Sequence, residues 1–270
     1  MKNFCGLCGF NNPKGTATGI IIKEGKVLVV KRKEEPFKGD WDFPGGYMDA
    51  GETSEQTMKR EIKEELGVDC DTTFIGWFPG NGFWQGKKFA VLSHVFLVEP
   101  KGVLKLNKKE NSMMKFVPIN KLKDIAFDSN KNIAKFVRNN FSVDFPRLLE
   151  LVRQLDASAK VNENNFYKAV LDGYISKKFV KGKLVGIGWI FSRRTLLRKQ
   201  AVIEDVVVDE KERGKGFGKE ITLDLMRWAK ATGVEVIELT SGSHRIAANE
   251  LYKKVGFKLH PTNHYLYSVV

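Results

Sequence analysis

The chain has few cysteines and no long apolar run. Its 270 residues include three cysteines, an odd number that argues against a disulfide scaffold and fits a reducing compartment. The longest apolar runs, such as residues 95–98 and 206–208, are far too short to span a bilayer. The first ten residues contain no apolar segment of the kind that a signal peptide has. We therefore expect a cytoplasmic protein with no membrane partner.

Dense lysine or arginine tracts and RNA-binding aromatic signatures are also absent, although the formal net charge is +13. The positive charge is spread over both halves of the chain. A basic surface favours anionic ligands, such as nucleotides, coenzyme phosphates or nucleic acid. General solubility explains the charge equally well. We therefore rank nucleic acid last among the partners.

The length and composition indicate a globular protein of two domains. Hydrophobic residues make up 42% of the chain and charged residues 29%, which is enough apolar material for real cores. At 270 residues, two domains are favoured over one. The polar stretch NNFSVDFP, at residues 139–146, is the expected linker. We predict an α/β (α+β) protein whose domains meet between residues 143 and 144.

The periodicity of apolar residues assigns helices and strands on both sides of this boundary. Before it, strands are expected at residues 18–22, 27–31, 74–78, 88–98 and 113–117, and helices at 53–66 and 130–139. After it, helices are expected at residues 147–155, 163–175, 217–232 and 246–255, and strands at 184–191, 201–208, 236–240, near 257 and at 265–269.

The predicted helix of residues 53–66 carries an unusual acidic cluster. Thr53 and Gln56 form a capping box at its start, and Gly67 stops it. Glu61, Glu64 and Glu65 then share one face, although like charges at this spacing cost about 0.2–0.5 kcal/mol per pair. The cluster is either a solvated face or an oxygen cage for a divalent cation, Mg²⁺ or Mn²⁺.

The spacing around this helix resembles the Nudix box at every fixed position. The match runs from Gly46 through Glu52 to REIKEELGV at residues 60–68, and the similarity extends over about residues 14–140. The resemblance implies an α/β/α sandwich that hydrolyses a nucleoside diphosphate linked to another group, with Mg²⁺ bound at the helix. It implies Glu61, Glu64 and Glu65 as metal ligands and catalytic residues, one of them a possible general base, the Gly45 carbonyl as a further ligand, and Gly46, Glu52, Arg60 and Gly67 as structural residues.

Residues outside the box would complete this site. Many members of the family recruit a further acidic residue, for which Glu110 is the candidate and Glu99 the alternative. Phe83 and Trp84, in the predicted loop of residues 76–88, could stack on a nucleobase or belong to the core. The signatures of NADH and coenzyme A pyrophosphatases are absent, so the nucleotide is not identified.

The leader of residues 1–13 holds a single CxxC, formed by Cys5 and Cys8. It resembles one knuckle of the zinc ribbon that precedes some Nudix domains. A closed zinc site needs four ligands, and no second CxxC follows. A degenerate remnant is therefore favoured over a zinc site, which two subunits could share. Cys70 is expected to be a packing residue.

A basic, glycine-rich turn, RGKGFG at residues 213–218, follows an apolar strand and opens a patterned helix. Such a turn presents backbone N–H groups and the positive end of the helix dipole to an anion such as pyrophosphate. The turn, the strand end VVVDE and the segment ANELYKKVGF at residues 248–257 resemble the GNAT N-acetyltransferase fold over about residues 145–270. Arg245 stands where many members carry asparagine.

The GNAT resemblance implies a mixed central sheet and acetyl-CoA as the cofactor. Tyr252 occupies the position of a tyrosine that protonates the departing thiolate, with packing on a short helix as its alternative. Glu204, or else Asp205, would deprotonate the acceptor amine. The pyrophosphate would lie on the amides of Arg213, Gly214, Lys215, Gly216, Phe217 and Gly218, and the pantetheine alongside Val206 and Val208.

We therefore predict a bifunctional protein. A Mg²⁺-dependent Nudix pyrophosphohydrolase over residues 14–143 is followed by an acetyl-CoA-dependent N-acetyltransferase over residues 144–270. In the alternative, one domain senses a nucleotide or CoA without turnover and regulates the other. The expected partners are a nucleotide-type substrate, acetyl-CoA and an amine acceptor. The sequence identifies neither the acceptor nor the oligomeric state.

Overall fold

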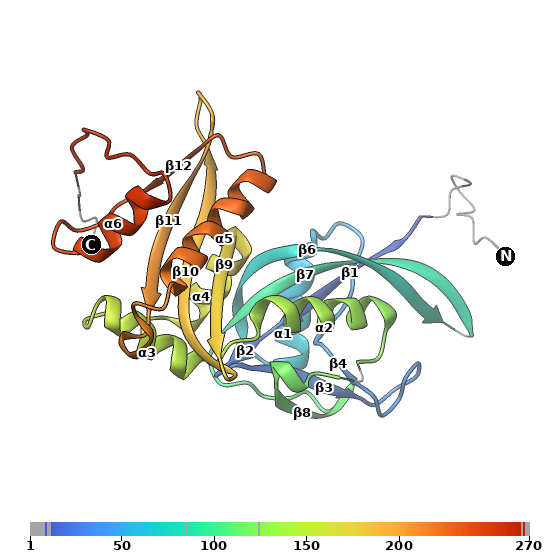
Figure 1. The fold of residues 1–270 in the computed structure, drawn as a ribbon. Coiled ribbons are helices and arrows are strands. Elements are labelled where there is room, and N and C mark those ends of the chain that lie inside the picture. The colour runs from blue at the N-terminus through green and yellow to red at the C-terminus, as the bar shows by residue number, and fades with distance from the viewer. Residues whose placement is uncertain (1–8, 10–11, 85, 124, 266, 268–270) are drawn as a thin grey trace. The chain divides into compact units, whose positions relative to one another are not determined.

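The computed structural model of the chain describes residues 9, 12–84, 86–123, 125–265 and 267 (Figure 1). The chain forms two compact units. The first comprises Met1–Phe145 together with Asn162–Lys168, and the second comprises Pro146–Val161 together with Ala169–Val270. Cys5 and Cys8 lie outside the described residues. In the part that is described, no helix has the length and apolar character needed to cross a membrane.

Two sheets form the centre of the first unit. The larger is mixed, because its two central strands run parallel to each other while the outer strands are antiparallel. The smaller is antiparallel. The larger sheet has the order β5 (Gly45–Tyr47), β1 (Lys14–Ile20), β7 (Lys87–Lys101), β6 (Asp69–Trp84), and the smaller holds β2 (Ile22–Lys23), β3 (Lys26–Arg32), β4 (Trp41–Asp42) and β8 (Asn111–Pro118).

Helix α1 (Ser54–Leu66) begins and ends where its sequence predicts. The Thr53 hydroxyl accepts from the Gln56 amide at 3.2 Å, and the Gln56 side chain accepts from the Thr53 amide at 2.8 Å. Gly67 ends the helix in the left-handed conformation, with φ 70°. Met58, Ile62 and Leu66 are fully buried in a core that also contains Cys70, so Cys70 is a packing residue.

Residues 76–88 were expected to form a loop, and this prediction is wrong. Strand β6 continues to Trp84 and pairs with β7 along its whole length, with one register shift between Phe74 and Gly76. The Gly-Pro-Asn-Gly sequence within it suggested a break. Proline lacks an amide for the ladder, but β6 is the edge strand of its sheet, where that loss is tolerated. Figure 1 shows the resulting long hairpin of β6 and β7.

Helix α2 (Asp128–Phe141) packs against β6 and β7, and the short 3₁₀ helix η1 (Ile119–Lys121) precedes it. Helix α4 (Glu163–Asp172) also belongs largely to the first unit, although α3 (Phe145–Leu155) lies before it in the chain. Glu163 accepts the amides of Glu24 and Gly25, both at 2.7 Å, and so holds the tight turn between β2 and β3. The chain therefore leaves the first unit at Phe145 and returns to it for residues 162–168.

Tyr167 fixes this returning segment. Its side chain is fully buried, its ring lies 5.3 Å from that of Phe141, and its hydroxyl donates to Glu163 at 2.7 Å. Replacing Tyr167 with alanine is expected to destabilise the first unit by about 3–5 kcal/mol, because a buried aromatic ring is lost and a cavity remains. Hydrogen exchange of the α1 amides, read by mass spectrometry, should become faster.

The control for this prediction is Tyr167→Phe, which keeps the ring and loses one hydrogen bond worth about 1 kcal/mol. It should change the exchange of α1 much less. Wild-type exchange rates in Tyr167→Ala would contradict the assignment of residues 162–168 to the first unit's core.

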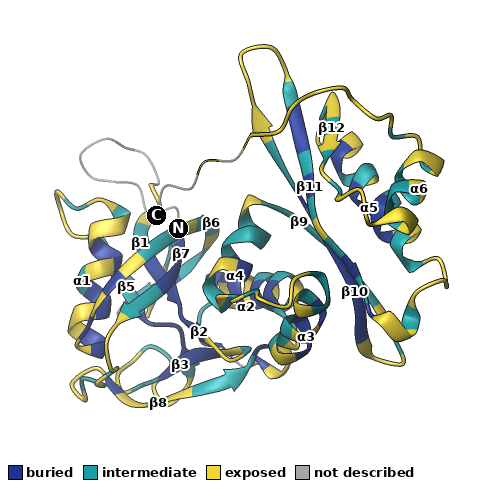
Figure 2. Ribbon diagram, turned by 90° about the vertical axis from the view of Figure 1, so that its left-hand side faces the viewer, coloured by how far each residue is buried: buried dark blue, intermediate teal, exposed yellow. Residues whose placement is uncertain are grey.

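The second unit has one mixed sheet of order β12-β11-β10-β9. Strands β9, β10 and β11 form an antiparallel meander, and β12 is parallel to β11. Ile221, Leu225 and Ala229 of α5 are fully buried against the sheet, and Figure 2 shows the buried stretch along β10. The elements are β9 (Gly173–Val180), β10 (Lys183–Arg194), β11 (Lys199–Val208), η2 (Glu210–Glu212), α5 (Phe217–Ala231), β12 (Val236–Leu239) and α6 (Ile246–Lys254).

Two of the predictions for this unit are wrong, and a third falls partly outside the described residues. The helix predicted for residues 163–175 ends at Asp172, and Gly173 begins β9, which was not expected. A Cβ on Gly173 would lie 2.0 Å from the Ile190 carbonyl oxygen, so the strands approach closely only at glycine. No strand forms near Phe257, whose amide donates to the Tyr252 carbonyl at 3.0 Å and extends the turn after α6. A strand was also predicted for residues 265–269. Residues 265 and 267 are not in a strand, and residues 266, 268 and 269 lie outside the described residues.

A buried ion pair joins α3 to the end of β11. Arg147 donates to the Asp209 carboxylate and, at 2.9 Å, to the Leu184 carbonyl. Asp209 also accepts the Lys211 amide at 3.0 Å and caps η2. These contacts fix the start of the glycine-rich turn.

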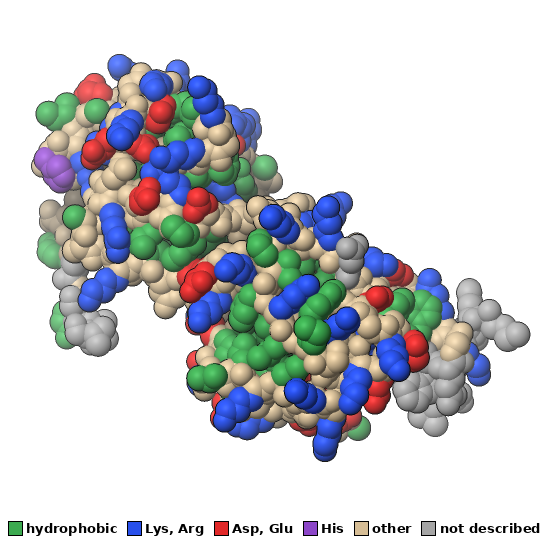
Figure 3. All heavy atoms as spheres, turned by 90° about the horizontal axis from the view of Figure 1, so that it is seen from below, with side chains coloured by type: hydrophobic (Ala, Val, Ile, Leu, Met, Phe, Trp, Pro, Cys, Tyr) green, Lys and Arg blue, Asp and Glu red, His purple; other side chains and the backbone are tan. Residues whose placement is uncertain are grey.

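Charged side chains are distributed over the surface. On the face drawn in Figure 3, lysine and arginine side chains are scattered among apolar and acidic ones and do not form a single tract. The spread of charge inferred from the sequence is therefore visible on this face.

Candidate active sites

The three glutamates of α1 differ in burial. Glu61 and Glu65 are 8% and 6% exposed, whereas the Glu64 side chain is 53% exposed. The apolar stripe of α1 faces the core, and this orientation places Glu61 and Glu65 at the edge of the buried region. A Cβ on Gly46 of β5 would lie 2.3 Å from Glu61 Oε1, so only glycine lets this carboxylate lie against the strand.

Burial raises the pKa of both inner carboxyls. For Glu65, burial and then the charge of Glu61 raise the pKa to about 8, while the hydrogen bond from Asn111 acts in the opposite direction. Asn111 Nδ2 donates to Glu65 Oε1 at 3.2 Å, but Glu65 Oε2 is buried and has no hydrogen-bond partner among the residues that the structure describes. An unpartnered buried carboxylate oxygen beside a second carboxylate is a position that a cation would stabilise.

Arg60 holds the outer part of the cluster together. Its guanidinium donates to Glu52 at 2.8 and 3.1 Å, to Glu61 Oε1 at 2.8 Å and to Glu64 Oε2 at 3.2 Å. The Arg60 hydrogen bonds, followed by that of Thr57, lower the pKa of Glu52 to about 2. Glu52 thus ties the loop before α1 to the helix, and Arg60 aligns two of the clustered carboxylates.

The donor set fits a hard divalent cation. In the described ranges no three metal-binding side chains converge on one point, and the Arg60 guanidinium donates to both Glu61 and Glu64. All the available donors are oxygens, and one of them is buried and unpartnered, which suits Mg²⁺ or Mn²⁺. Gly45 lies beside the cluster, where its backbone lowers the pKa of Glu65. The role of its carbonyl as a ligand stays a prediction.

The two acidic candidates outside α1 occupy different surroundings. The charge of Glu110 contributes to the raised pKa of both Glu61 and Glu65, so Glu110 lies near the cluster. Glu99 accepts from Asn164 Nδ2 at 2.9 Å and forms an ion pair with Lys168. Glu99 therefore helps to hold α4, and Glu110 remains the candidate for the site.

A polar network next to the cluster could not be predicted from the sequence. Asn111 pairs with Arg32 across β8 and β3, and Arg32 lies 3.6 Å from the Asp42 carboxylate. Asp42 is buried and accepts from Asn130 Nδ2 at 2.5 Å. The available sequence signal was the aspartate in WDFPGG, directly before the glycine pair of the box.

The buried Asp42 carboxyl predicts a specific pH dependence. Burial raises its pKa from the ordinary 3.8 to about 6, so the folded protein binds this proton more tightly than the unfolded chain does. The resulting stabilisation is complete below about pH 4 and is lost as the pH rises through about 6. Relative to Asp42→Asn, the wild type should lose about 2 kcal/mol of unfolding free energy between about pH 4.5 and 7.5.

Urea unfolding of both proteins at the two pH values, in chelator, measures this difference. The Asp128→Asn variant is a suitable control, because Asp128 is an exposed carboxylate at the start of α2. A pH-independent difference between wild type and Asp42→Asn would show that Asp42 does not titrate in this range.

Phe83 lies in a small aromatic cluster. Its ring is 5.6 Å from that of Phe37, which is 5.0 Å from that of Phe127. The Arg32 guanidinium lies 4.9 Å over the Phe127 ring and links the cluster to the polar network. Phe83 is half-buried, so both of its expected roles remain open. The Trp84 side chain lies outside the described residues.

The glycine-rich turn of the second unit has the form of an anion site. Gly214 and Gly216 have φ values of 80° and 88°, which glycine adopts readily. Gly216 is the N-cap of α5 and provides no side-chain hydrogen bond. Among the described residues, no acceptor pairs with the amides of residues 217–219. The first turn of α5 therefore presents free amides and the positive end of the helix.

The basic side chains of the turn are partly engaged within it. Lys215 Nζ lies 2.7 Å from Glu212, and Arg213 Nε donates to the Val208 carbonyl at 3.1 Å. The side chains of Val206 and Val208 pack on the core of the second unit. A pantetheine alongside this strand would therefore meet its backbone. Gly218 leaves room beside Leu251, because a Cβ there would lie 3.3 Å from that side chain.

The middle of β11 carries Glu204, whose charge acts on Tyr252, so two predicted catalytic residues lie close together. Asp205 has φ 54°, and the pairing of β10 with β11 shifts register between Ile187 and Trp189. Burial raises the pKa of Tyr252, and the charge of Glu204 adds to this rise. Burial also raises the pKa of Glu204, which His264 opposes. His264 is a neighbour that no sequence motif indicated.

Arg245 has a structural role. It is the N-cap residue of α6, and its guanidinium donates to the Leu155 carbonyl at 3.3 Å. The ring of Tyr252 lies 6.0 Å from that of Phe257. Tyr252 therefore packs against Phe257, and its catalytic role stays a prediction.

Comparison with known proteins supports both resemblances. The sequence profile of the NUDIX domain matches residues 13–139, and that of the acetyltransferase (GNAT) family matches residues 135–257. The ADP-ribose pyrophosphatase of Methanocaldococcus jannaschii is 34% identical over 128 residues, which cover 47% of this chain and 75% of the relative. The chain thus belongs to the Nudix family in its first half and to the GNAT acetyltransferase family in its second.

Other relatives match shorter parts. The 8-oxo-dGTP diphosphatase of Haemophilus influenzae is 48% identical over 54 residues, 19% of this chain and 40% of the relative, so the chain spans less than half of that protein. A putative acetyltransferase of known structure from Agrobacterium tumefaciens is 24% identical, with a TM-score of 0.42, over 46% of this chain and 94% of that chain. The predicted fold class, a Nudix sandwich followed by a GNAT fold, is confirmed.

Proposed function

We propose that the first unit hydrolyses the pyrophosphate bond of a nucleoside diphosphate linked to another moiety, with Mg²⁺ or Mn²⁺. The second unit then transfers an acetyl group from acetyl-CoA to an amine. The observation that carries the first activity is Glu65, buried beside Glu61 with one carboxylate oxygen unpartnered. A cytoplasmic location fits the free thiol of Cys70.

The residues of the first unit divide the work between binding and proton transfer. When bound, a divalent cation offsets the pyrophosphate charge and lowers the pKa of water. Glu61, Glu64 and Glu65 would hold it, with Glu110 at the edge. Arg60 orients Glu61 and Glu64 through its hydrogen bonds. Burial raises the pKa of Glu65 to about 8, so this carboxyl would give up its proton when a cation binds beside it. One of the three glutamates would then serve as general base for the attacking water.

The substrate is expected to resemble those named for the relatives. ADP-ribose and 8-oxo-dGTP both contain a nucleoside diphosphate, and they match the reaction class of the box. The rings of Phe37, Phe83 and Phe127 offer an apolar surface for a base. The Arg32 guanidinium, 4.9 Å over the Phe127 ring, adds positive charge beside them.

In the second unit, the acceptor amine would attack the thioester carbonyl of acetyl-CoA. Glu204 takes the proton that the amine loses, and Tyr252 gives its hydroxyl proton to the departing sulfur as the C–S bond breaks. The free amides at the start of α5 would hold the coenzyme's pyrophosphate, through residues 213–218. The raised pKa of Tyr252 keeps its hydroxyl protonated at neutral pH, as this role requires.

A sensing role for one unit is the second candidate, and the interleaved chain favours it. Residues 146–161 belong to the second unit and residues 162–168 to the first. The two units therefore share this stretch of chain, and a ligand that orders one unit would restrain the adjoining part of the other. Nucleotide binding without product, together with a changed rate of acetyl-CoA turnover, would select this alternative over hydrolysis.

The deciding experiment is a nucleotide panel incubated with the full chain and Mg²⁺. ADP-ribose, 8-oxo-dGTP, dinucleotides and CoA esters are compared, and release of nucleoside monophosphate or phosphate is measured by chromatography. Turnover of at least one nucleotide that stops with chelator is expected. If no member of the panel yields product, the hydrolase proposal fails. The same panel in a thermal-shift assay reports binding.

A further inference from the structure

The hairpin of β10 and β11 extends beyond the rest of its sheet. Strand β9 pairs with β10 only as far as Phe191, and β12 pairs with β11 only from Gln200 onward. The hairpin end, residues 192–199, is therefore flanked by no further strand in the described part of the chain. Figure 1 shows this end projecting past β12, and Figure 2 shows most of its length as exposed.

Two leucines form the turn of the hairpin end. Leu196 and Leu197 are 105% and 87% exposed, although short turns favour glycine, asparagine, aspartate and proline. Neither leucine contributes to the core of the second unit. The folding of this unit therefore does not explain why the turn is apolar.

Thr195 satisfies part of the turn's backbone. Its hydroxyl oxygen accepts the amides of Leu197 and Arg198 at 3.3 and 3.2 Å, and its own amide donates to the Arg198 carbonyl at 3.0 Å. A free backbone amide is costly in an apolar medium, because it loses its hydrogen bonds to water. These amides keep their partners when water is removed, so the turn is suited to entering such a medium.

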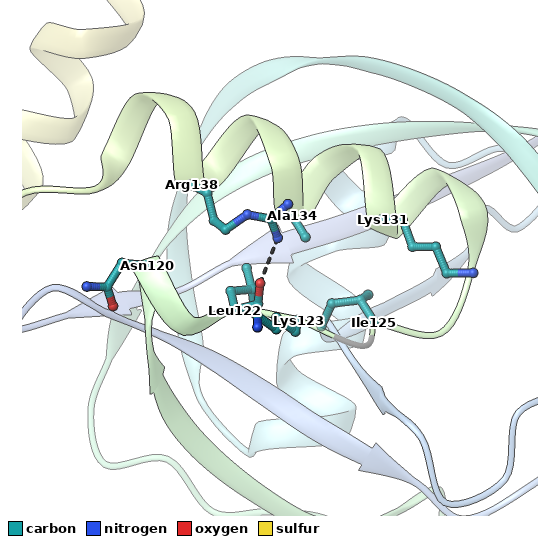
Figure 4. Close-up of a pocket in the computed structure, with 7 residues that line it drawn as sticks. All are labelled: Asn120, Leu122, Lys123, Ile125, Lys131, Ala134 and Arg138. Atoms are coloured by element: carbon teal, nitrogen blue, oxygen red, sulfur yellow. Dashed lines mark hydrogen bonds between the residues drawn. The ribbon is translucent and has the colours of Figure 1, made fainter.

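Most arginine side chains among the described residues donate to an acceptor of the same unit. In the first unit, Arg138 donates to the Leu122 carbonyl at 2.7 Å, drawn as a dashed line in Figure 4. In the second unit, Arg193 pairs with Glu238 at 2.7 Å. An exposed arginine without such a partner has all five of its N–H donors available for an external anion.

Two arginines of this kind flank the leucines. Arg194 and Arg198 are exposed, and in the described ranges neither has a carboxylate within ion-pair distance. Arg194 lies directly opposite Lys199 in the ladder of β10 and β11, where like charges repel each other. Lys199 also donates to the Thr232 carbonyl at 2.7 Å. No acidic residue occurs at positions 192–203, so an anionic surface would relieve the repulsion.

We propose that the hairpin end binds the surface of an anionic phospholipid membrane. Leu196 and Leu197 would enter the boundary between headgroups and acyl chains, and Arg194 and Arg198 would lie at the level of the lipid phosphates. Peripheral binding strengthens with buried apolar area and with attraction to anionic lipids, and the hairpin end offers both. A nucleic acid would use the arginines but offers no apolar layer for the leucines.

This surface is independent of both proposed activities, because none of its residues belongs to the glutamate cluster, the glycine-rich turn or the pair of Glu204 and Tyr252. The expectation of no membrane partner rested on the lack of a spanning segment. Peripheral contact needs no such segment.

Co-sedimentation of the full chain with vesicles tests the proposal. Vesicles of phosphatidylcholine with phosphatidylserine are compared with vesicles of phosphatidylcholine alone, and the partition coefficient is measured from the bound protein. Wild-type binding should be stronger by about tenfold or more on the vesicles with phosphatidylserine. Leu196→Ser with Leu197→Ser should lower the partition coefficient by about tenfold. Arg194→Gln with Arg198→Gln should lower it by about 25-fold, because each cation near such a surface contributes about fivefold.

Each variant has a matched control. Val103→Ser with Phe179→Ser replaces two other exposed apolar side chains, and Phe179 lies on β9, outside the hairpin end. Arg153→Gln with Lys160→Gln removes two other exposed cations of the second unit. Both controls should bind as the wild type does.

The leucine and arginine variants replace exposed side chains, so both should melt at the wild-type temperature. Absence of wild-type binding to the vesicles with phosphatidylserine would overturn the proposal. Equal binding to the two kinds of vesicle would overturn it too, and so would a leucine variant that binds as well as its control. A short RNA duplex whose binding falls in the arginine variant, while vesicle binding does not, would assign the arginines to nucleic acid instead.

Discussion

Replacing Glu64 with glutamine is expected to lower Mg²⁺-dependent hydrolysis of ADP-ribose by about 10³-fold, within the range of about 10²–10⁴ for loss of one positioned acid–base group. Glutamine keeps the shape of the side chain but removes a charge that a metal would need. Because Glu64 is 53% exposed, the free energy of unfolding should change by no more than about 0.5 kcal/mol. Initial rates over a range of Mg²⁺ concentrations measure the effect.

The control is Glu55→Gln, on the same helix. Glu55 is equally exposed and pairs with Lys59 at 2.6 Å, away from the cluster. This variant should hydrolyse ADP-ribose at the wild-type rate. Acetyl-CoA binding should be unchanged in both variants, which shows that the chain is folded. Wild-type activity in Glu64→Gln would remove Glu64 from the site.

Replacing Tyr252 with phenylalanine is expected to lower kcat of acetyl transfer by about 10²–10³-fold, the scale of a lost general acid. The KM for acetyl-CoA should stay the same, because the coenzyme is expected to bind through the turn of residues 213–218. The ring and its contact with Phe257 are retained. The assay follows CoA release with whichever amine of a panel of polyamines, amino acids and peptides proves to be an acceptor.

Tyr174→Phe provides the comparison for this variant. The Tyr174 hydroxyl donates to Asp224 at 2.9 Å, in a contact between β9 and α5. Its loss should reduce stability by about 1 kcal/mol without changing kcat. An unchanged kcat in Tyr252→Phe would leave Tyr252 as a packing residue, the role that the sequence had left open.

The parts of the fold that were predicted correctly rest on local signals. Helix α1 is specified by its own capping box, its apolar stripe and Gly67, all within 15 residues. The position of Glu61 and Glu65 follows from that periodicity. Helix α5 and its glycine-rich turn are likewise determined by neighbouring residues. The family resemblance then supplied the fold class of each half, which no local pattern contains.

The errors arose where tertiary contacts override local signals. Pro79 is tolerated in β6 only because that strand is at an edge. Gly173 begins a strand because Ile190 lies against it. The network of Asn111, Arg32 and Asp42 joins three separate strands, and it exists only once β3 and β8 are in register. No spacing in the sequence encodes that register.

The return of α4 to the first unit has a consequence for how the gene can change. Glu163 and Tyr167 are encoded after the whole of α3, which belongs to the second unit. A deletion that removes the acetyltransferase half at any point before them also removes the support for the turn at Gly25. A chain that ended at residue 145 would therefore lack part of the first unit's own core.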